Sequence, residues 1–359
     1  MPRELHIVLS GLPGKMETLV AETLLKEIEN KGGFALQAQA LTGPNQPREV
    51  SIGRVHGFYL IPPEKHEEVL RAMIGNETYK PLIVVDFSQP DAVNRNAELY
   101  CKLGIPFVMG TTGGDRKRLE QVVVDSGNVA VIAPNMALPI VALQEFMERF
   151  SRQHEGQMKG YTLKVRESHQ QTKQDTSGTA KAFLKYFQRL GIELDSTPVD
   201  NLKMEKPVDI MLPLGGDSSF TVIRNPNTQR AMKIPEEHLA GHGWHKYTIT
   251  PPKGSDLEEL SLLQTDFSIF LGRHPAFRDY NKTDLPPRYD ATSKDGNVQI
   301  AFGGLNFQGA SDVFIQHNIN GRQVYADGGF EAIRFLPRHL GERGKVYTMI
   351  DVMREIGGN

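Results

Sequence analysis

One polar segment of the chain combines an imidazole, an ammonium group and the start of a helix. His169 and Lys173 lie four residues apart, and Ser177-Gly178-Thr179 follow directly. An imidazole exchanges a proton near neutral pH, and the unpaired N–H groups of a helix start suit a carboxylate. These residue types predict a cationic pocket with a proton donor, which is a site for a small anionic substrate.

Hydrophobic spacing on both sides of this segment indicates the elements that hold it. Tyr161, Leu163 and Val165 alternate with polar residues, which is the period of a half-buried strand. Apolar residues recur every three or four positions over Ala180–Leu190, as in a helix with one buried face. A polar loop that carries His169 therefore joins a strand to a helix. Such corners are common, so a merely solvated loop is an equal alternative from this segment alone.

A second candidate site opens the chain, where a glycine turn joins a strand to a helix. The strand is Leu5–Leu9, and the turn contains Gly11 and Gly14. Glu17 stands where a third glycine would complete the dinucleotide-binding pattern. In that pattern glycine lets the backbone approach a pyrophosphate at a helix N-terminus. The incomplete motif alone is a weak signal for a nucleotide site.

The next strand bears on the choice between the two nicotinamide cofactors. It is predicted near Phe34–Leu41 and ends without the Asp or Glu that would hydrogen-bond the ribose of NAD. An acid there would repel a 2′-phosphate, so its absence favours NADPH, with NADH as the alternative. Lys15 is a candidate for the cation that meets this phosphate.

Strands and helices alternate regularly through the first half of the chain. Apolar strands are predicted at Pro81–Phe87, Pro106–Met109 and Ala130–Ala133, with helices at Ala92–Leu103 and Arg116–Val124 between them. This alternation predicts an α/β domain with a Rossmann-like doubly wound parallel sheet, whose strand-end loops face one crevice.

The second half of the chain contains fewer helix signals. A helix is predicted at Ile140–Phe150, and residues 276–297 are predicted to form a long exposed loop because they are rich in Pro, Asp, Asn and Lys. Helices at Gly328–Arg338 and Met349–Glu355 end the chain. Short strands are predicted at Ser219–Ile223, Tyr247–Thr250, Leu260–Ile269, Val298–Phe302 and Val313–Asn318.

Two domains follow from this change of pattern. Residues 1–137 plus 328–359 are expected to form the dinucleotide-binding domain. Residues 138–327 are expected to form a smaller α+β domain with a mixed, largely antiparallel sheet, for substrate binding and oligomerisation.

Composition excludes several classes of protein. The chain has 359 residues, 39% hydrophobic and 23% charged, as in a soluble globular protein of two domains. A net charge of −2 gives no basic field for nucleic acid or a membrane surface, and no apolar run is long enough to span a bilayer. The single cysteine, Cys101, excludes a disulfide framework. Because a strand begins almost at the first residue, we expect no targeting peptide and a cytoplasmic protein.

Several short segments, in one order, resemble dihydrodipicolinate reductase, and specifically its plant-type branch. Four of them carry glycine turns or strand ends: Gly11-x-x-Gly14-Lys15-Met16, Val84-Val85-Asp86-Phe87-Ser88-x-Pro90, Gly110-Thr111-Thr112-Gly113 and Ala133-Pro134-Asn135-Met136. Residues Glu167–Ala180 resemble the family signature, and Pro235–His245 and Tyr347–Glu355 resemble the plant-type branch. Their order makes the resemblance more specific than any single motif.

The resemblance implies a reaction and its residues. The family reduces 4-hydroxy-tetrahydrodipicolinate, a small dicarboxylate, to tetrahydrodipicolinate in the diaminopimelate route of lysine biosynthesis, with a nicotinamide cofactor and no metal. His169 would be the general acid, and Lys173 would hold one carboxylate and assist proton transfer. The amide of Gln170 and the backbone N–H groups of Ser177, Gly178 and Thr179 would bind the substrate as well.

The resemblance also implies the cofactor contacts and a homo-oligomer, either a tetramer or a dimer. The pyrophosphate would lie on Gly11, Leu12, Pro13, Gly14, Lys15 and Met16. The nicotinamide would be lined by Gly110, Thr111, Thr112, Pro134, Asn135 and Met136, with Phe87 and Ala133 also at the cofactor.

Some features depart from this pattern. The common bacterial signature has a second His where this chain has Gln170, and residues 208–218 and 262–310 look longer than in relatives. His238, His242 and His245 have a spacing that could bind a metal, but no cysteine joins them, the family needs no metal, and a helix–strand corner explains them. The alternatives to the reductase are another Rossmann-type oxidoreductase, such as an amino-acid or sugar dehydrogenase, and a non-catalytic NADPH-sensing protein.

Overall fold

The structure is a computed structural model that describes residues 4–53, 56–111, 113–255, 257–285, 288–304 and 312–357. The chain divides by its internal contacts into two compact units of similar length. Unit 1 comprises Met1–Leu138 and Gln323–Asn359, and unit 2 comprises Pro139–Arg322. Within the described part of the chain, no helix is both long and apolar enough to cross a membrane.

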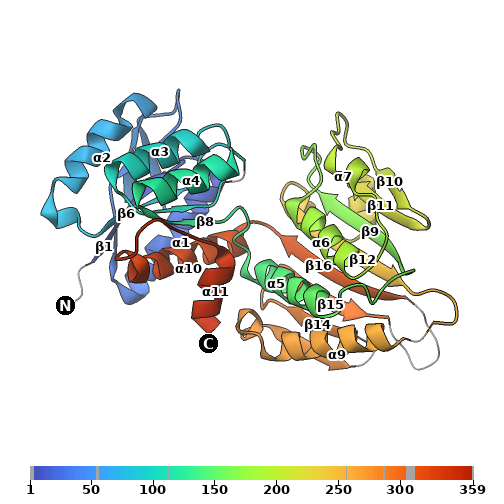
Figure 1. Ribbon diagram of the computed structural model, residues 1–359. Coiled ribbons are helices and arrows are strands. Elements are labelled where there is room, and N and C mark those ends of the chain that lie inside the picture. Colours follow the sequence, from blue (N-terminus) through green and yellow to red (C-terminus); the bar gives the residue numbers. More distant parts are fainter. Residues whose placement is uncertain are drawn as a thin grey trace. The chain divides into compact units, whose positions relative to one another are not determined.

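Unit 1 is built on a sheet with the strand order β17-β8-β7-β6-β1-β3-β5-β4, in which β2 also pairs with β1 (Figure 1). Its strands are β1 (Leu5–Ser10), β2 (Phe34–Leu36), β3 (Gln39–Leu41), β4 (Glu49–Ile52), β5 (His56–Ile61), β6 (Leu82–Asp86), β7 (Phe107–Met109), β8 (Val129–Ile132) and β17 (Lys345–Tyr347). Neighbouring strands run parallel, except that β4 is antiparallel to β5.

Helices cover both faces of this sheet. One face carries α1 (Lys15–Lys31) and α10 (Gln323–Phe335), and the other carries α2 (His66–Ile74), α3 (Val93–Leu103) and α4 (Arg116–Ser126) (Figure 1). The strand between them, β6, is buried at every position, as expected for a strand covered on both sides. The short helix α11 (Met349–Gly357) follows β17. The predicted Rossmann-like fold class of this half is confirmed.

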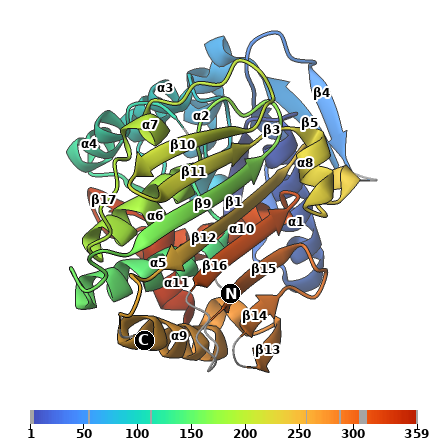
Figure 2. The same ribbon diagram turned by 90° about the vertical axis from the view of Figure 1, so that its right-hand side faces the viewer.

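Unit 2 is built on a sheet with the strand order β10-β11-β9-β12-β16-β15-β14-β13 (Figure 2). The strands are β9 (Thr162–His169), β10 (Ile210–Gly215), β11 (Ser218–Ile223), β12 (His242–Thr250), β13 (Asn281–Leu285), β14 (Arg288–Thr292), β15 (Val298–Gly303) and β16 (Val313–Asn320). β11 pairs parallel with β9, and the other neighbours pair antiparallel. This is the mixed, largely antiparallel sheet that the sequence predicts.

Three helices pack on the buried face of this second sheet: α5 (Leu138–Gln153), α6 (Gly178–Arg189) and α9 (Glu258–Arg273). Aromatic contacts hold them there. Phe183 of α6 stacks on Tyr247 of β12 with 4.5 Å between ring centroids. Phe267 of α9 contacts both Phe146 of α5 and Phe302 of β15. Two shorter helices are α7 (Thr197–Asp200) and α8 (Pro226–Ala231).

The strand predicted at Leu260–Ile269 is wrong, because these residues form the middle of α9. The buried positions Leu260, Leu263, Phe267 and Phe270 recur every three or four residues, which is the spacing of a helix face rather than of a strand.

The long exposed loop predicted over residues 276–297 is also wrong. The hairpin β13–β14 lies in this range, and its Tyr289 and Ala291 are buried. The hairpin pairs onto the edge strand β15 and so extends the sheet. Pro286 and Pro287 lie outside the described residues.

Candidate active site

His169 is the last residue of β9, rather than part of the loop predicted for it. β9 pairs with β12, so that Gly243 lies opposite His169 and His245 lies opposite Glu167. A Cβ at Gly243 would lie 3.1 Å from Cε1 of His169, so this glycine makes room for the imidazole. Two strands that are distant in sequence thus set the position of the ring.

One hydrogen bond fixes the tautomer of His169. Its Nδ1 lies 3.0 Å from the carbonyl oxygen of His242. Because a carbonyl only accepts, Nδ1 carries the proton, and a neutral ring leaves Nε2 as a bare acceptor. Nε2 is buried and finds no hydrogen-bond partner in the described part of the chain. Burial lowers the pKa of His169 well below its usual range, so the ring is neutral at neutral pH.

A buried ion pair stands beside this imidazole. Arg224 donates through Nη2 to Oε1 of Glu167 at 2.7 Å, and both side chains are fully buried. The guanidinium also donates to the carbonyl oxygens of Lys173 and Asp175, at 3.1 and 3.0 Å, and so holds the loop after β9. Burial alone would raise the pKa of Glu167, but its contact with His245 and the charge of Arg224 hold this pKa well below its usual range.

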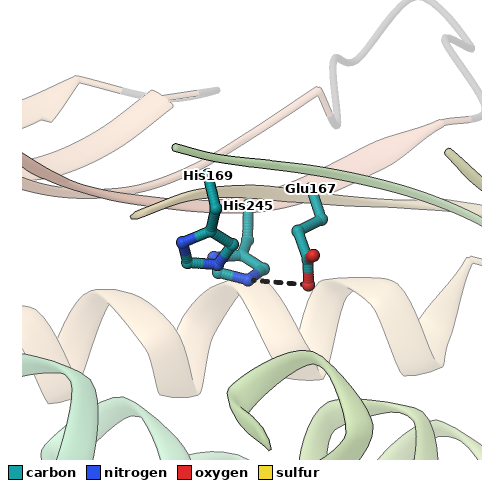
Figure 3. Close-up of side chains that lie close together, drawn as sticks. All are labelled: Glu167, His169 and His245. Carbon is teal, nitrogen blue, oxygen red and sulfur yellow. Dashed lines mark ion pairs between the residues drawn. The ribbon is translucent and has the colours of Figure 1, made fainter. Parts of the chain in front are cut away.

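His245 connects the ion pair to the start of α6. Its Nε2 lies 2.7 Å from Oγ of Ser177 and 3.5 Å from Oε2 of Glu167. Its ring packs edge-on against that of His169, with 5.1 Å between centroids (Figure 3). Ser177 in turn caps α6, because its Oγ accepts from the N–H of Ala180 at 3.0 Å. The imidazole, the ion pair and the helix cap therefore form one connected cluster.

The start of α6 offers fewer N–H groups than the sequence predicts. The N–H of Ser177 already donates to Oε2 of Glu167 at 2.9 Å. The N–H groups of Gly178 and Thr179 have no acceptor among the described residues, as is usual for the first turn of a helix. These two groups remain for a carboxylate.

Lys173 and Gln170 lie in a turn between His169 and α6. The N–H of Lys173 donates to the carbonyl of Gln170 at 3.0 Å, and its Nζ donates to Oδ1 of Asp175 at 2.5 Å. The Asp175 side chain is 64% exposed, so solvent or an anion has access to this pair. The structure thus places the predicted acid, cation and helix start on one β9–α6 segment.

His242 and His245 of the histidine motif after residue 235 belong to this cluster. His242 has both ring nitrogens engaged, since Nε2 lies 2.8 Å from Oγ of Ser168 and Nδ1 lies 3.1 Å from the carbonyl of His238. Glu167, His169 and His245 offer ligand atoms within 4.8 Å of one another (Figure 3). Each of these three side chains already makes a hydrogen bond within the protein, so we interpret the group as a hydrogen-bonded cluster.

Sequence reasoning missed Arg224, gave Glu167 no role and read His242 and His245 only as a metal motif. Arg224 lies between Ile223 and Asn225 with no local pattern around it. Only the parallel pairing of β11 with β9 brings it to the carboxylate. A fully buried arginine needs a buried anion, but burial is not visible in sequence.

Unit 1 has a pocket of about 710 Å³ at the carboxyl ends of β1, β3 and β6. This volume suits a small ligand or one half of a dinucleotide. The turn residues Gly11, Leu12, Pro13 and Gly14 line it. Further lining residues that the sequence did not indicate include Thr42, Gly43, Gln46, His66, Ser88 and Arg95.

Both glycines of this turn are required because a Cβ at either position would clash with the backbone. Gly11 has a φ of +130°, and a Cβ there would lie 2.8 Å from the carbonyl oxygen of Phe87. A Cβ at Gly14 would lie 2.7 Å from the carbonyl oxygen of Gly11. Glu17 replaces the third glycine, is fully buried and accepts from the N–H of Phe87 at 3.1 Å. Burial and the nearby Asp86 raise the pKa of Glu17 well above its usual range, so both disfavour a negative charge on it.

The buried carboxylate of Asp86 organises the strand ends below the pocket. It accepts from Oγ of Ser10 at 3.1 Å, from the hydroxyl of Tyr100 at 2.7 Å and from Nδ2 of Asn96 at 3.0 Å. The N–H and hydroxyl of Ser88 donate to its other oxygen. The loops after β1 and β6 are therefore held by one carboxylate.

The remaining predicted cofactor residues lie at neighbouring strand ends. The ring of Phe87 occupies the space that a Cβ at Gly110 would need. In α10, Gly328 similarly admits the backbone of Met136, a contribution that the sequence did not indicate. Lys15 and Met16 begin α1, Thr111 donates to the carbonyl of Ser88, and Ala133, Pro134 and Asn135 follow β8. Thr112 lies outside the described residues.

Comparisons with known proteins give consistent results. The family model described as dihydrodipicolinate reductase, N-terminus, matches residues 5–136. A 4-hydroxy-tetrahydrodipicolinate reductase 2 from Arabidopsis thaliana is 36% identical over 358 residues, which cover 98% of this chain and 78% of that protein. A probable 4-hydroxy-tetrahydrodipicolinate reductase 2 from Oryza sativa subsp. japonica is 34% identical over 356 residues, which cover 97% and 83%. A dipicolinate-bound dihydrodipicolinate reductase from Paenisporosarcina sp. TG-14 aligns with a TM-score of 0.48, at 13% identity, over 97% of this chain and 98% of that one.

These relatives correct the expected location of the protein. All four plant relatives that match nearly the whole chain are named as chloroplastic. The prediction of a cytoplasmic protein is therefore wrong. Its basis was the early start of the first strand, which carries no information about the compartment.

Proposed function

Because the chain belongs to the dihydrodipicolinate reductase family, in its plant-type branch, we propose that it reduces 4-hydroxy-tetrahydrodipicolinate to tetrahydrodipicolinate with a nicotinamide cofactor. The reaction is a step of the diaminopimelate route of lysine biosynthesis. The resemblance inferred from the motifs is confirmed at the level of the family.

The arrangement around His169 carries this proposal. The imidazole lies at the end of β9, and a lysine and two unoccupied N–H groups follow it on the same segment. A dicarboxylate needs a cation and N–H donors, and the reduced ring needs a proton source. We therefore assign His169 as the general acid, Lys173 as the cation for one carboxylate, and Gly178 and Thr179 as N–H donors to the other. Ser177 acts through its cap of α6, and Gln170 remains a candidate for an uncharged contact.

The electron pair comes as hydride from the nicotinamide when the cofactor is bound. The residues of unit 1 suit such a group: Gly11 and Gly14 expose backbone, and the raised pKa of Glu17 reduces its repulsion of a pyrophosphate. Unit 1 is accordingly proposed as the dinucleotide-binding domain, and unit 2 as the substrate-binding and oligomerisation domain.

We propose NADPH as the preferred cofactor. No acidic residue follows β3 at the pocket, where Thr42, Gly43 and Gln46 lie instead. Arg95 lines the same pocket and makes no hydrogen bond or ion pair with other described residues. Lys15, the cation that the sequence suggested, does not line it. The guanidinium of Arg95 is therefore the proposed partner of a 2′-phosphate, in a pocket that Glu64 and Asp91 also line.

The test is NADPH oxidation by the purified protein, with substrate generated in place by a dihydrodipicolinate synthase from pyruvate and aspartate semialdehyde. We expect oxidation that depends on the synthase, faster with NADPH than with NADH at low cofactor concentration. A folded protein that binds NADPH but oxidises neither cofactor would overturn the proposed reaction. Light scattering of the same sample tests the proposed homo-oligomer, since a monomeric mass contradicts it.

A further inference from the structure

A general acid must carry a proton on the atom that faces its substrate, and His169 of the free protein does not meet this condition. Its Nδ1–H donates to the carbonyl oxygen of His242 at 3.0 Å, and this carbonyl has no proton to donate to Nδ1. The neutral ring then presents Nε2 as a lone pair. This atom is buried, and no described residue could accept a hydrogen bond from it if it were protonated. The proton needed for the reaction is thus missing before substrate arrives.

The charged groups around His169 explain why the free ring stays neutral. The positive charges of Arg224, on the loop after β11, and Lys173, on the loop after β9, disfavour a positive charge on His169 and so lower its pKa. The carboxylate of Glu167 on β9 favours a charged His169, but it is already paired with Arg224 at 2.7 Å. The imidazoles that face the same cluster are His242 and His245 on β12 and His317 on β16. Burial lowers the pKa of His317 well below its usual range, as it does for His169.

A bound dicarboxylate changes this balance in two ways. It brings two negative charges next to Lys173 and the start of α6, and its carboxylate oxygens give a protonated Nε2 an acceptor. An opposite charge within about 4–6 Å shifts a pKa by about one to three units toward the charged form. Since burial had displaced the pKa of His169 downward, a shift of this size brings the ring back toward neutral pH.

We infer that His169 is a proton acceptor in the free protein and becomes the proton-donating imidazolium only when a dicarboxylate binds, so that binding takes up one proton from solvent. The inference rests on the proposed function and extends it to the state of the acid. The proton enters on Nε2, while Nδ1 keeps its hydrogen bond to His242. During reduction this proton goes to the ring carbon next to the one that receives hydride, and His169 returns to its neutral form. Loss of water from the hydroxylated substrate leaves a carbon–carbon double bond, and hydride and proton together add two electrons and two hydrogens to it.

The inference predicts the direction in which pH changes the affinity for a dicarboxylate. The complex binds one proton more than the free protein does, so raising the pH opposes binding. Between the pKa of His169 in the free protein and its higher pKa in the complex, the dissociation constant rises about tenfold for each pH unit, and above the pKa in the complex it levels off. A site whose acid is already protonated in the free protein would show no such slope over the same range.

The experiment is titration calorimetry of pyridine-2,6-dicarboxylate, an unreactive dicarboxylate, into the full chain saturated with NADP⁺. Titrations at pH 6.0, 6.75 and 7.5, each in two buffers whose ionisation enthalpies differ widely, give the number of protons taken up at each pH. We expect the uptake to approach one proton per site at the pH where it is largest, since a single imidazole charges. His169→Gln keeps an amide of similar size but cannot charge, and we expect it to bind with about zero uptake.

His317→Gln is the matched control, because it removes a buried imidazole of the same cluster and leaves the His169–His242 hydrogen bond in place. It should retain the uptake. Less than about 0.3 proton in the unmodified protein, or full uptake in His169→Gln, would overturn the inference and leave the proposed reaction standing. Absence of any dicarboxylate binding to the unmodified, folded protein would instead overturn the proposed function and this inference with it.

Discussion

In unit 1 the glycine turn offers backbone to a ligand, whereas in unit 2 the candidate site is made of ionisable side chains. The pocket of unit 1 lies against Gly11–Gly14, and the buried carboxylate of Asp86 near it accepts hydrogen bonds from neutral donors. The cluster of unit 2 contains a fully buried ion pair, Glu167 with Arg224, and an imidazole that lacks its second proton.

This difference teaches how each region holds a charged ligand. A site made of backbone groups has fixed partial charges, and the ligand must be able to approach them closely. Ligand binding there should therefore be weakened more by an added side-chain atom than by a removed one. A side-chain site has net charges that must balance after burial, so a lost atom harms it more. The variants below are chosen to separate these two sensitivities.

The largest effect is expected in unit 2, from the imidazole itself. His169→Gln removes the only group assigned as proton donor, so kcat should fall by roughly 10²–10⁴-fold. Synthase-coupled NADPH oxidation measures it, with His154→Gln, an imidazole bonded to Gln157 away from the cluster, as control. A kcat within threefold of the parent, about 0.6 kcal/mol, would contradict the assigned role.

The next effect concerns the buried ion pair of the same cluster. Arg224→Met leaves the carboxylate of Glu167 buried without its cation, which should lower the free energy of unfolding by about 3–5 kcal/mol. The double variant Arg224→Met with Glu167→Gln should recover part of this loss, because no uncompensated charge remains. Urea unfolding of both proteins measures the difference, and equal losses in the two would show that the charge is not the cause.

An added methyl group tests the backbone site of unit 1. Gly11→Ala forces a side chain onto a φ of +130° and places its Cβ 2.8 Å from the carbonyl of Phe87. We expect a loss of about 1–3 kcal/mol in stability and weaker cofactor binding. Gly43→Ala lines the same pocket with no atom within 4 Å of its Cβ, so its stability should stay within about 0.5 kcal/mol. Similar losses in both variants would refute the steric argument.

One side chain of unit 1 is nevertheless expected to matter, for cofactor choice. Arg95→Ala should raise the KM for NADPH about tenfold and leave the KM for NADH unchanged, because NADH has no 2′-phosphate for it to meet. Lys15→Ala, at the start of α1, should affect both cofactors alike. A change that falls equally on NADPH and NADH in Arg95→Ala would assign the guanidinium another role.

The smallest effect comes from a surface imidazole of unit 1. Burial slightly opposes charge on His339, but its hydrogen bonds to Glu342 and Glu355, both 2.8 Å, raise its pKa. The stabilisation is therefore present below the ordinary histidine pKa and is lost as pH rises through the raised value. Because solvent screens these pairs, we expect Tm to fall by only about 1–2 °C across that range. His339→Gln should remove this pH dependence, and a Tm that instead rises with pH would contradict the sign.

Part of unit 1 could be predicted because β1, β6, β7 and β8 are apolar runs, whereas β4, β5, α2 and β17 were not predicted. The alternation at Leu82–Asp86, Val93–Leu103 and Phe107–Met109 needs no distant partner to be recognised. Prediction failed at Glu258–Arg273, where apolar residues with the spacing of a helix face were taken for a strand. It failed again at the hairpin β13–β14, whose polar composition masks a pairing with β15.

The sequence by itself determined the residue types of both candidate sites and their family, because glycine turns, an imidazole and a helix start are local features with local spacing. Only the tertiary structure decided the state of these residues. The pairing of β9 with β12 and β11 gives His169 its tautomer, Glu167 its cation and Ser177 its imidazole. Burial and charge balance depend on what strands distant in sequence bring within a few ångströms, and no local pattern contains that information.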